Sequence, residues 1–214
     1  MSLATLLVLA DGRLPAGGHA HSGGLETAVS SGRVRTVADV GRFLCGRLFT
    51  AGLVAAAFAA AACARPDRWA ELDDGLDART PSPALRKASR AQGRALLRAA
   101  RAMWPLPAAG REPHHPVALG VVAAAARLDP AAAAVAAAHG SVTGPASAAV
   151  RLLGLDPYAV HALLAGLAPD CDRIAADAAA RIDDPVDALP AAGAPLLDIG
   201  AELHATWEVR LFAS

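Results

Sequence analysis

A segment rich in histidine and glycine, LADGRLPAGGHAHSGGLE, occupies residues 9–26. His19 and His21 stand two positions apart, so in an extended segment both side chains project to one side, where neutral imidazoles bind nickel, copper or zinc. A firm site needs a third and a fourth ligand, and the other histidines are distant in sequence. They are His114, His115, His139, His161 and His204. The pattern leaves open a transient metal contact or a structural loop, in which His21 is hydrogen-bonded and His19 lies at the surface.

The glycines of this segment do not make a phosphate-binding loop. Such a loop follows a strand and needs a Lys and a Ser or Thr after its glycines, and GGHAHSGGLE has neither the strand nor the lysine. The glycine pairs at 17–18 and 23–24 instead suit positive φ angles or a close backbone approach. Ser22 can cap a following helix, which places Glu26 in its first turns, where the helix dipole favours an acid.

A basic stripe follows in the middle of the chain, within LRKASRAQGRALLRAARAM at residues 85–103. Five side chains fall within about a quarter turn of a helical wheel. They are Lys87, Arg90, Arg94, Arg98 and Arg101. The stripe is either a solvated helix face or a docking surface for an acidic partner, because guanidinium groups pair well with carboxylates. Beside it, Ser89 and Gly93 lie one turn apart and let another backbone approach closely.

No catalytic constellation is present in the sequence. There is no Gly-x-Ser-x-Gly elbow and no HExxH, and the acid pairs at 73–74 and 183–184 fall at expected loop or cap positions. The cysteines Cys45, Cys63 and Cys171 are far apart, which excludes a disulfide framework and a cysteine zinc site. We expect Cys45 to be buried and inert. The chain is therefore predicted not to be an enzyme and to hold no cofactor of its own.

Composition narrows the class of protein further. The chain has 214 residues and a formal net charge of zero, so nothing draws it as a whole to nucleic acid or to an anionic membrane. A DNA-binding regulator that uses the basic stripe is disfavoured for the same reason. The N-terminus lacks a basic leader, and the apolar run at 51–64 is too short and alanine-rich to cross a bilayer comfortably. We expect a cytoplasmic protein without nucleic-acid or membrane partners.

Helices must position all these residues. Alanine dominates the apolar content, and no segment alternates apolar and polar residues for long enough to predict a strand. Leu3, Leu6, Leu7 and Ala10 predict a short amphipathic helix that ends before Asp11. Thr36 is the expected cap of a long central helix that continues to about residue 62, with Asp39 in its first turn.

Prolines mark further helix starts. Ser82-Pro83, Asp129-Pro130, Asp156-Pro157 and Asp184-Pro185 each place a capping side chain before a proline at the first helical position. Proline-rich linkers at 79–83, 104–116 and 183–195 separate the segments. The sequence thus predicts an all-α, single-domain bundle over residues 1–214, with roughly eight to ten helices.

The opening segment resembles a known family signature. LLVLADGRLPAGGHAHSGGLETAVSSG, residues 6–32, is similar to the run LLxLxDxxLPxGGFxHSxGLExxV of the UreF family of urease accessory proteins. Weaker likenesses keep their order along the chain, in LRKASRAQGRALL, HHPVALG and AAVRLLGLD. The likeness ends with APLLDIGAELHATWEVRLFAS at 194–214, which resembles the closing PxLDIxxxxHExxxxRLFxS of that family.

The resemblance carries over residue by residue. The positions that match the N-terminal motif are Asp11, Leu14, Pro15, Gly17, Gly18, His21, Ser22, Gly24, Leu25 and Glu26. The positions that match the C-terminal tail are Arg210, Leu211, Phe212 and Ser214. His19 replaces the usual Phe, while Ala205 and Ala213 replace the usual Glu and Arg, so contacts made through those side chains are altered here.

The resemblance implies an all-helical, cytoplasmic, non-enzymatic scaffold. UreF-like proteins bind UreD, also called UreH, recruit the GTPase UreG and assist nickel insertion into apo-urease, as dimers within the complex. We expect residues 11–26 and the tail to form the partner surfaces, with Leu14, Leu25 and Phe212 as apolar anchors. On this hypothesis the assembled complex, and not this chain alone, handles nickel. The alternative is a nickel-binding metallochaperone that holds the ion through His19 and His21.

Overall fold

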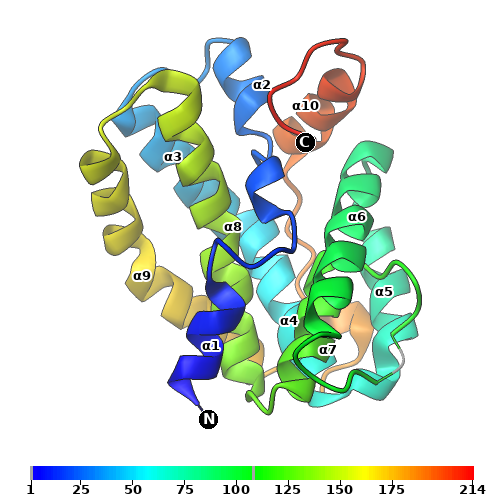
Figure 1. The fold of residues 1–214 in the computed structure, drawn as a ribbon. Coiled ribbons are helices and arrows are strands. Elements are labelled where there is room, and N and C mark those ends of the chain that lie inside the picture. The colour runs from blue at the N-terminus through cyan, green and yellow to red at the C-terminus, as the bar shows by residue number, and fades with distance from the viewer. Residues whose placement is uncertain (1, 108) are drawn as a thin grey trace.

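The computed structural model of the protein describes residues 2–107 and 109–214. Within these residues the chain is all-helical, which confirms the predicted fold class (Figure 1). The helices are α1 (Leu3–Ala10), α2 (Leu25–Ser30), α3 (Val37–Arg47), α4 (Leu53–Ala64), α5 (Trp69–Ala78), α6 (Pro83–Ala100), α7 (His115–Ala125), α8 (Pro130–Leu153), α9 (Pro157–Ala179) and α10 (Pro195–Ala205).

Helix α4 forms the centre of the bundle. Helices α5 to α7 lie on one side of it and α8 and α9 on the other (Figure 1). Its side chains from Ala56 to Cys63 are buried all round, and most of them are alanine. Small side chains let the backbones come close: a Cβ on Gly120 of α7 would collide with the carbonyl oxygen of Ala59. The core therefore depends on close helix approach more than on large side chains.

Helices α3 and α4 are continuous through a π-turn at Leu48–Gly52, which confirms the predicted long central helix. Thr36 caps it as expected, because its hydroxyl accepts the Asp39 N–H at 3.2 Å while the Asp39 carboxylate accepts the Thr36 N–H at 2.9 Å. By length and composition, the helix over 37–64 is the single described one that could cross a membrane. Half of its most apolar stretch is buried in the bundle, so a core position accounts for its apolarity.

Three of the four predicted proline starts are confirmed. The side chains of Ser82, Asp129 and Asp156 each accept a backbone N–H in the first turn of α6, α8 and α9. The fourth prediction is wrong, because Asp184-Pro185 leads only into a 3-10 turn at Val186–Ala188. Pro190 follows too soon for a helix to continue, since it lacks an N–H and keeps Leu189 extended.

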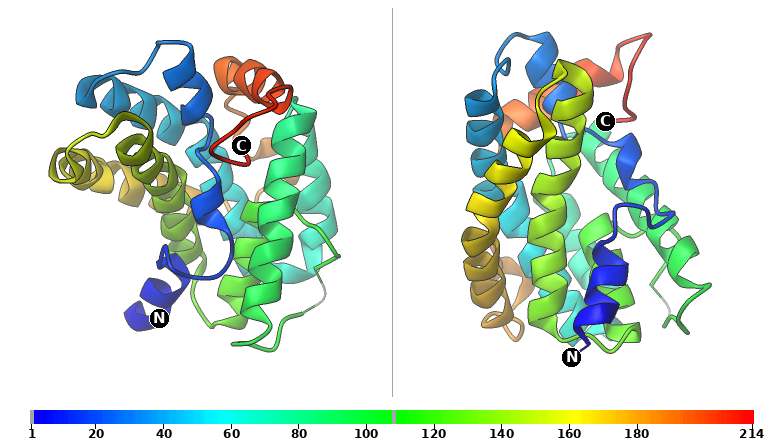
Figure 2. Two further views of the ribbon diagram at one scale, coloured as in Figure 1. Left: turned by 45° about the horizontal axis from the view of Figure 1, so that its top comes forward. Right: turned by 60° about the vertical axis from the view of Figure 1, so that its left-hand side comes forward.

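The predicted short helix before Asp11 is confirmed as α1, but the apolar positions that predicted it do not form its buried face. Leu9 is its buried residue, whereas Leu3 and Leu7 are exposed. Almost every position of LATLLVLA is apolar, so the sequence defines no unique face, and the packing of α1 along α8 selects the one that is buried (Figure 2). Cys45 differs from expectation too: it is exposed on α3, because its neighbour Leu44 takes the core position.

Candidate functional site

The N-terminal motif, residues 11–26, and the C-terminal tail, residues 210–214, lie against each other (Figures 1 and 2). The Ser22 N–H donates to the main-chain oxygen of Ser214 at 2.6 Å, and the Ser22 hydroxyl donates to the same oxygen at 2.9 Å. The Ala213 N–H donates to the carbonyl of Ala20 at 2.7 Å. The structure thus joins two segments that the sequence analysis treated as separate surfaces.

Glu26 fastens the tail a few residues further along. Its side chain is buried, with the residue 7% exposed. The carboxylate accepts the N–H of Leu211 at 2.9 Å and the N–H of Phe212 at 3.2 Å. His204 of α10 donates from Nε2 to the same carboxylate at 2.8 Å. Glu26 is therefore a positioning residue that holds both the tail and α10 on α2.

Ser22 and Glu26 also meet the local expectations for this helix start. The Ser22 hydroxyl accepts the Glu26 N–H at 3.2 Å, and Glu26 is the acid in the first turn of α2. Gly24 precedes the helix with a φ of +90°, and a Cβ there would lie 2.9 Å from a methyl carbon of Leu197. A glycine is needed at this position both for its conformation and for the close approach of α10.

Two of the expected partner anchors serve the chain's own core instead. Leu25 is fully buried and Phe212 is only 5% exposed, so both side chains pack within the chain itself. The Arg151 guanidinium stacks on the Phe212 ring at 4.6 Å from its centroid and donates to the carbonyl of His19 at 3.2 Å. In this structure Phe212 anchors the tail and Leu25 packs in the core, and contact of either residue with a partner stays a prediction.

The remaining motif residues lie nearer the surface. Asp11 forms an ion pair with Arg13 at 2.8 Å, a bond that lowers the pKa of the Asp11 carboxyl to about 2. Pro15 and Gly18 are exposed, Leu14 is half-buried, and Gly17 has a φ of +75°.

The two histidines of the motif differ in their surroundings. His19 is exposed, whereas the Nδ1 of His21 lies 2.7 Å from the hydroxyl of Ser214. Burial, followed by the charge of His19, lowers the pKa of His21. Across residues 2–107 and 109–214, no cluster of three or more His, Cys, Asp or Glu side chains is arranged to hold a metal ion. The structure therefore gives the pair of histidines no third ligand from the described part of the chain.

The five side chains of the basic stripe differ in their surroundings. Arg90 turns into the protein, where its guanidinium pairs with Asp73 at 2.8 Å and with Asp77 at 3.1 Å. Arg94 pairs with Glu112 at 2.5 Å. The members of the stripe that remain exposed without an ion pair among the described residues are Lys87, Arg98 and Arg101.

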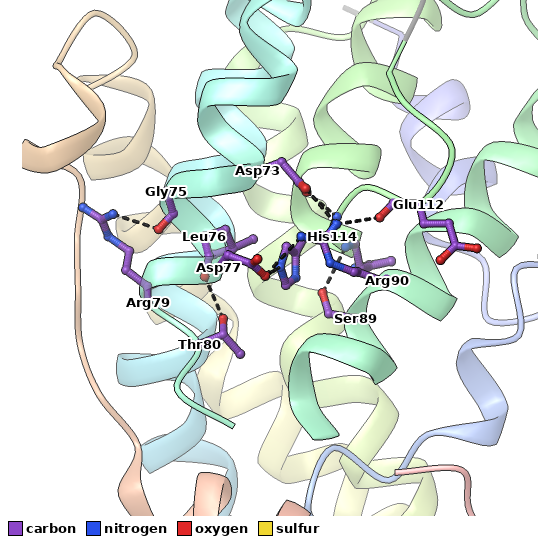
Figure 3. Close-up of polar contacts among 11 residues, drawn as sticks. Asp73, Gly75, Leu76, Asp77, Arg79, Thr80, Ser89, Arg90, Glu112 and His114 are labelled. Atoms are coloured by element: carbon purple, nitrogen blue, oxygen red, sulfur yellow. Dashed lines mark hydrogen bonds and ion pairs between the residues drawn. The ribbon is translucent and has the colours of Figure 1, made fainter. Parts of the chain in front are cut away.

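Arg90 belongs to a polar cluster that joins three elements: Asp73 and Asp77 of α5, Arg90 of α6, and Glu112 and His114 of the segment before α7 (Figure 3). The His114 N–H donates to Asp73 at 2.6 Å, and its Nε2 donates to Asp77 at 2.7 Å. Burial opposes ionisation of Asp77, but the bonds from His114 and Arg90 outweigh it and lower the pKa of that carboxyl. The cluster holds the helices together.

This cluster was not predicted from the sequence, whereas the close approach beside it was. The Ser89 hydroxyl accepts the His115 N–H at 3.1 Å, and Gly93 leaves room for the carbonyl of Pro113. Asp73 and Asp77 are four residues apart on one helix, a spacing that puts two carboxylates on one face. That spacing was the available signal for a buried partner of Arg90.

Arg90→Ala is expected to lower the free energy of unfolding by about 2 kcal/mol, because the buried carboxylate of Asp73 would lose its charged partner. Arg94→Ala is the matched control. Its ion pair is open to solvent, with the Arg94 side chain 55% exposed, so we expect a change of about 0.5 kcal/mol or less. Urea denaturation of both variants measures the difference, and equal losses would refute the stabilising role assigned to the pair of Arg90 with Asp73.

A cleft of about 1090 Å³ runs between the N-terminal motif and helices α6, α7 and α8. Its polar lining includes His21, Arg47, Ser89, His115 and His139. Burial, followed by the charge of His21, lowers the pKa of His115 to about 4. Burial thus favours the neutral form of His115 at physiological pH.

Comparisons with known proteins find similar sequences that cover the whole chain. The family model described as UreF matches residues 34–168. The chain is 51% identical to the urease accessory protein UreF of Mycobacterium sp. (strain JLS), with 100% of this chain and 99% of the relative covered. It is 48% identical to that of Mycolicibacterium vanbaalenii and 43% identical to that of Mycobacterium tuberculosis (strain H37Rv), over the same shares of both chains.

Proposed function

Because the chain belongs to the UreF family of urease accessory proteins, we propose that it is a non-enzymatic scaffold for urease maturation. In this role it binds UreD, also called UreH, and recruits the GTPase UreG, and the assembly inserts nickel into apo-urease. The GTPase supplies the phosphate-binding loop that this sequence lacks. Nickel is cargo of the complex, and the chain needs no resident cofactor.

The paired motif and tail support this proposal most directly. The Ser22 hydroxyl donates to the tail and the Glu26 carboxylate accepts from it, so the tail is already held in place. A partner that binds its outward side chains does not have to pay the entropy of ordering it. Leu211 is 69% exposed, and Val209 and Arg210 are exposed beside it. Arginine and large apolar side chains are typical of the few residues that dominate binding energy. This surface, residues 209–211, is the proposed contact with a partner protein.

The remaining features of the proposal follow from the same family role. We place the protein in the cytoplasm, as a homodimer within the complex, without nucleic-acid or membrane partners. The zero net charge suits binding to specific protein surfaces rather than to polyanions.

Arg210→Ala is expected to weaken co-purification with UreD and UreG at least about tenfold, the effect of losing roughly 1.4 kcal/mol of binding energy. The helical circular dichroism signal and the melting temperature should not change, because Arg210 makes no hydrogen bond or ion pair with the described residues. Co-expression followed by affinity capture and quantification of each partner measures the effect.

Arg181→Ala serves as the control for this experiment, since Arg181 is an exposed arginine just after α9, outside the motif, the tail and the basic stripe. Its capture of both partners should equal that of the unmodified protein. If Arg210→Ala also captures both partners fully, residues 209–211 are not the contact surface.

A further inference from the structure

Arg47 occupies an unusual position at the end of α3. Its Nε donates to the carbonyl of Ser141 at 2.9 Å, and its Nη1 donates to the carbonyl of Gly23 at 2.9 Å. The carbonyl of Ser141 is free to accept because Pro145, four residues later in α8, has no N–H. The side chain thus links the N-terminal motif to α8 and faces the cleft.

The charge of Arg47 has no anionic partner in the described part of the chain. No carboxylate of those residues lies within ion-pair distance of its guanidinium, and burial alone lowers its pKa to about 10. The cleft lining holds two acidic side chains, Asp11 and Asp198, and neither forms an ion pair with Arg47. A partly buried cation without a paired carboxylate is unfavourable, so the Arg47 guanidinium is a suitable contact for an anion that enters the cleft.

The guanidinium has donors to spare. Of its five N–H groups, two are used on the carbonyls of Ser141 and Gly23. Nη2 has no hydrogen-bond partner among the described residues, and it is not fully buried. Because Arg47 lines the cleft, an anion in the cleft can reach this nitrogen. The free N–H groups on Nη1 and Nη2 can bind two oxygens of one anion side by side.

Two histidines that line the cleft can add uncharged hydrogen-bond donors beside the Arg47 guanidinium. His21 and His115 line the same cleft, and the charge of His21 contributes to the lowered pKa of His115. Neutral imidazoles supply an N–H each, which complements an anion without adding a second buried charge. The apolar remainder of the cleft raises the strength of such charge-assisted bonds.

We propose that this cleft binds a small oxyanion of the carboxylate or phosphate type, with the Arg47 guanidinium as its charged contact. His21 and His115 contribute neutral hydrogen-bond donors. The site does not include residues 209–211 of the tail. Anion binding and partner binding can therefore be tested independently of each other.

The test uses inorganic phosphate and acetate as probes on the purified full-length chain. Isothermal titration at constant ionic strength, with chloride as the balancing anion, should show saturable binding of at least one probe. Arg98→Ala should bind it equally well, because Arg98 lies outside the cleft lining. Absence of saturable binding to the unmodified chain would overturn the proposal.

Two variants separate a binding site from a merely structural arginine. Ala51→Glu puts a carboxylate on the cleft wall four residues after Arg47. This carboxylate can pair with the Arg47 guanidinium in place of the probe anion. We expect it to weaken probe binding at least about tenfold without lowering the melting temperature. Arg47→Lys keeps the charge but loses the planar fork, and should weaken binding similarly. Binding that is unchanged in Ala51→Glu and Arg47→Lys would contradict the assignment to Arg47.

Discussion

Replacing Glu26 with Gln is expected to lower the free energy of unfolding by about 3 kcal/mol, which corresponds to a fall of about 6 to 12 °C in melting temperature. The carboxylate accepts three hydrogen bonds, from Leu211, Phe212 and His204. An amide offers one acceptor oxygen and turns its own N–H groups towards these donors, so the network cannot be rebuilt. Thermal denaturation and amide hydrogen exchange at residues 211 and 212 measure the two consequences.

Glu208→Gln is the matched control, because Glu208 is an exposed glutamate that makes no hydrogen bond or ion pair with the described residues. It should leave both stability and tail protection unchanged. In Glu26→Gln, loss of amide protection should accompany reduced capture of UreD and UreG. A variant whose residues 211 and 212 stay protected would show that Ser22 alone is sufficient to hold the tail.

Gly93→Ala is expected to cost about 3 kcal/mol of stability, because an added methyl would overlap the carbonyl group of Pro113. The colliding atoms belong to the backbone, so no flexible side chain can move aside. The segment that would have to shift also carries His114, whose N–H bonds to Asp73. The substitution should therefore loosen the whole polar cluster around Arg90, as measured by urea denaturation.

Gly140→Ala provides the opposite case on another helix. Gly140 lies inside α8, and a Cβ there would meet no atom within 4 Å. Alanine is the better helix former, so this variant should gain about 0.5 to 1 kcal/mol. If both variants lose stability, the loss in Gly93→Ala cannot be assigned to the clash with Pro113.

Local chemistry was predictable from the sequence. The caps at Thr36, Ser82, Asp129 and Asp156 follow from side chains that bond to backbone N–H groups within a few residues. Such contacts span only one helical turn, so the neighbouring residues determine them. The all-α class follows in the same way from alanine content and from the lack of alternating segments.

Contacts between residues far apart in the sequence were harder to predict. The tail meets the motif across 192 positions, and neither spacing nor periodicity in either segment indicates that they pair. Helix dipole arguments placed Glu26 correctly, but they gave no sign that its carboxylate would accept bonds from the tail. Arg90 looked like its neighbours on a helical wheel, yet the position of α5 draws it inward. When the sequence of a helix does not distinguish its faces, the elements packed around it determine which face is buried.

The pairing of the motif with the tail has a consequence for the order of events during translation. Residue 22 leaves the ribosome 192 positions ahead of residue 214, which at cellular elongation rates is a delay of about 10 to 40 s. Throughout that interval Ser214 cannot bond to Ser22, so residues 209–211 lack part of their support, however far the bundle has folded. On the function proposed above, a partner that recognises residues 209–211 would therefore bind only those chains in which residue 214 has already been synthesised.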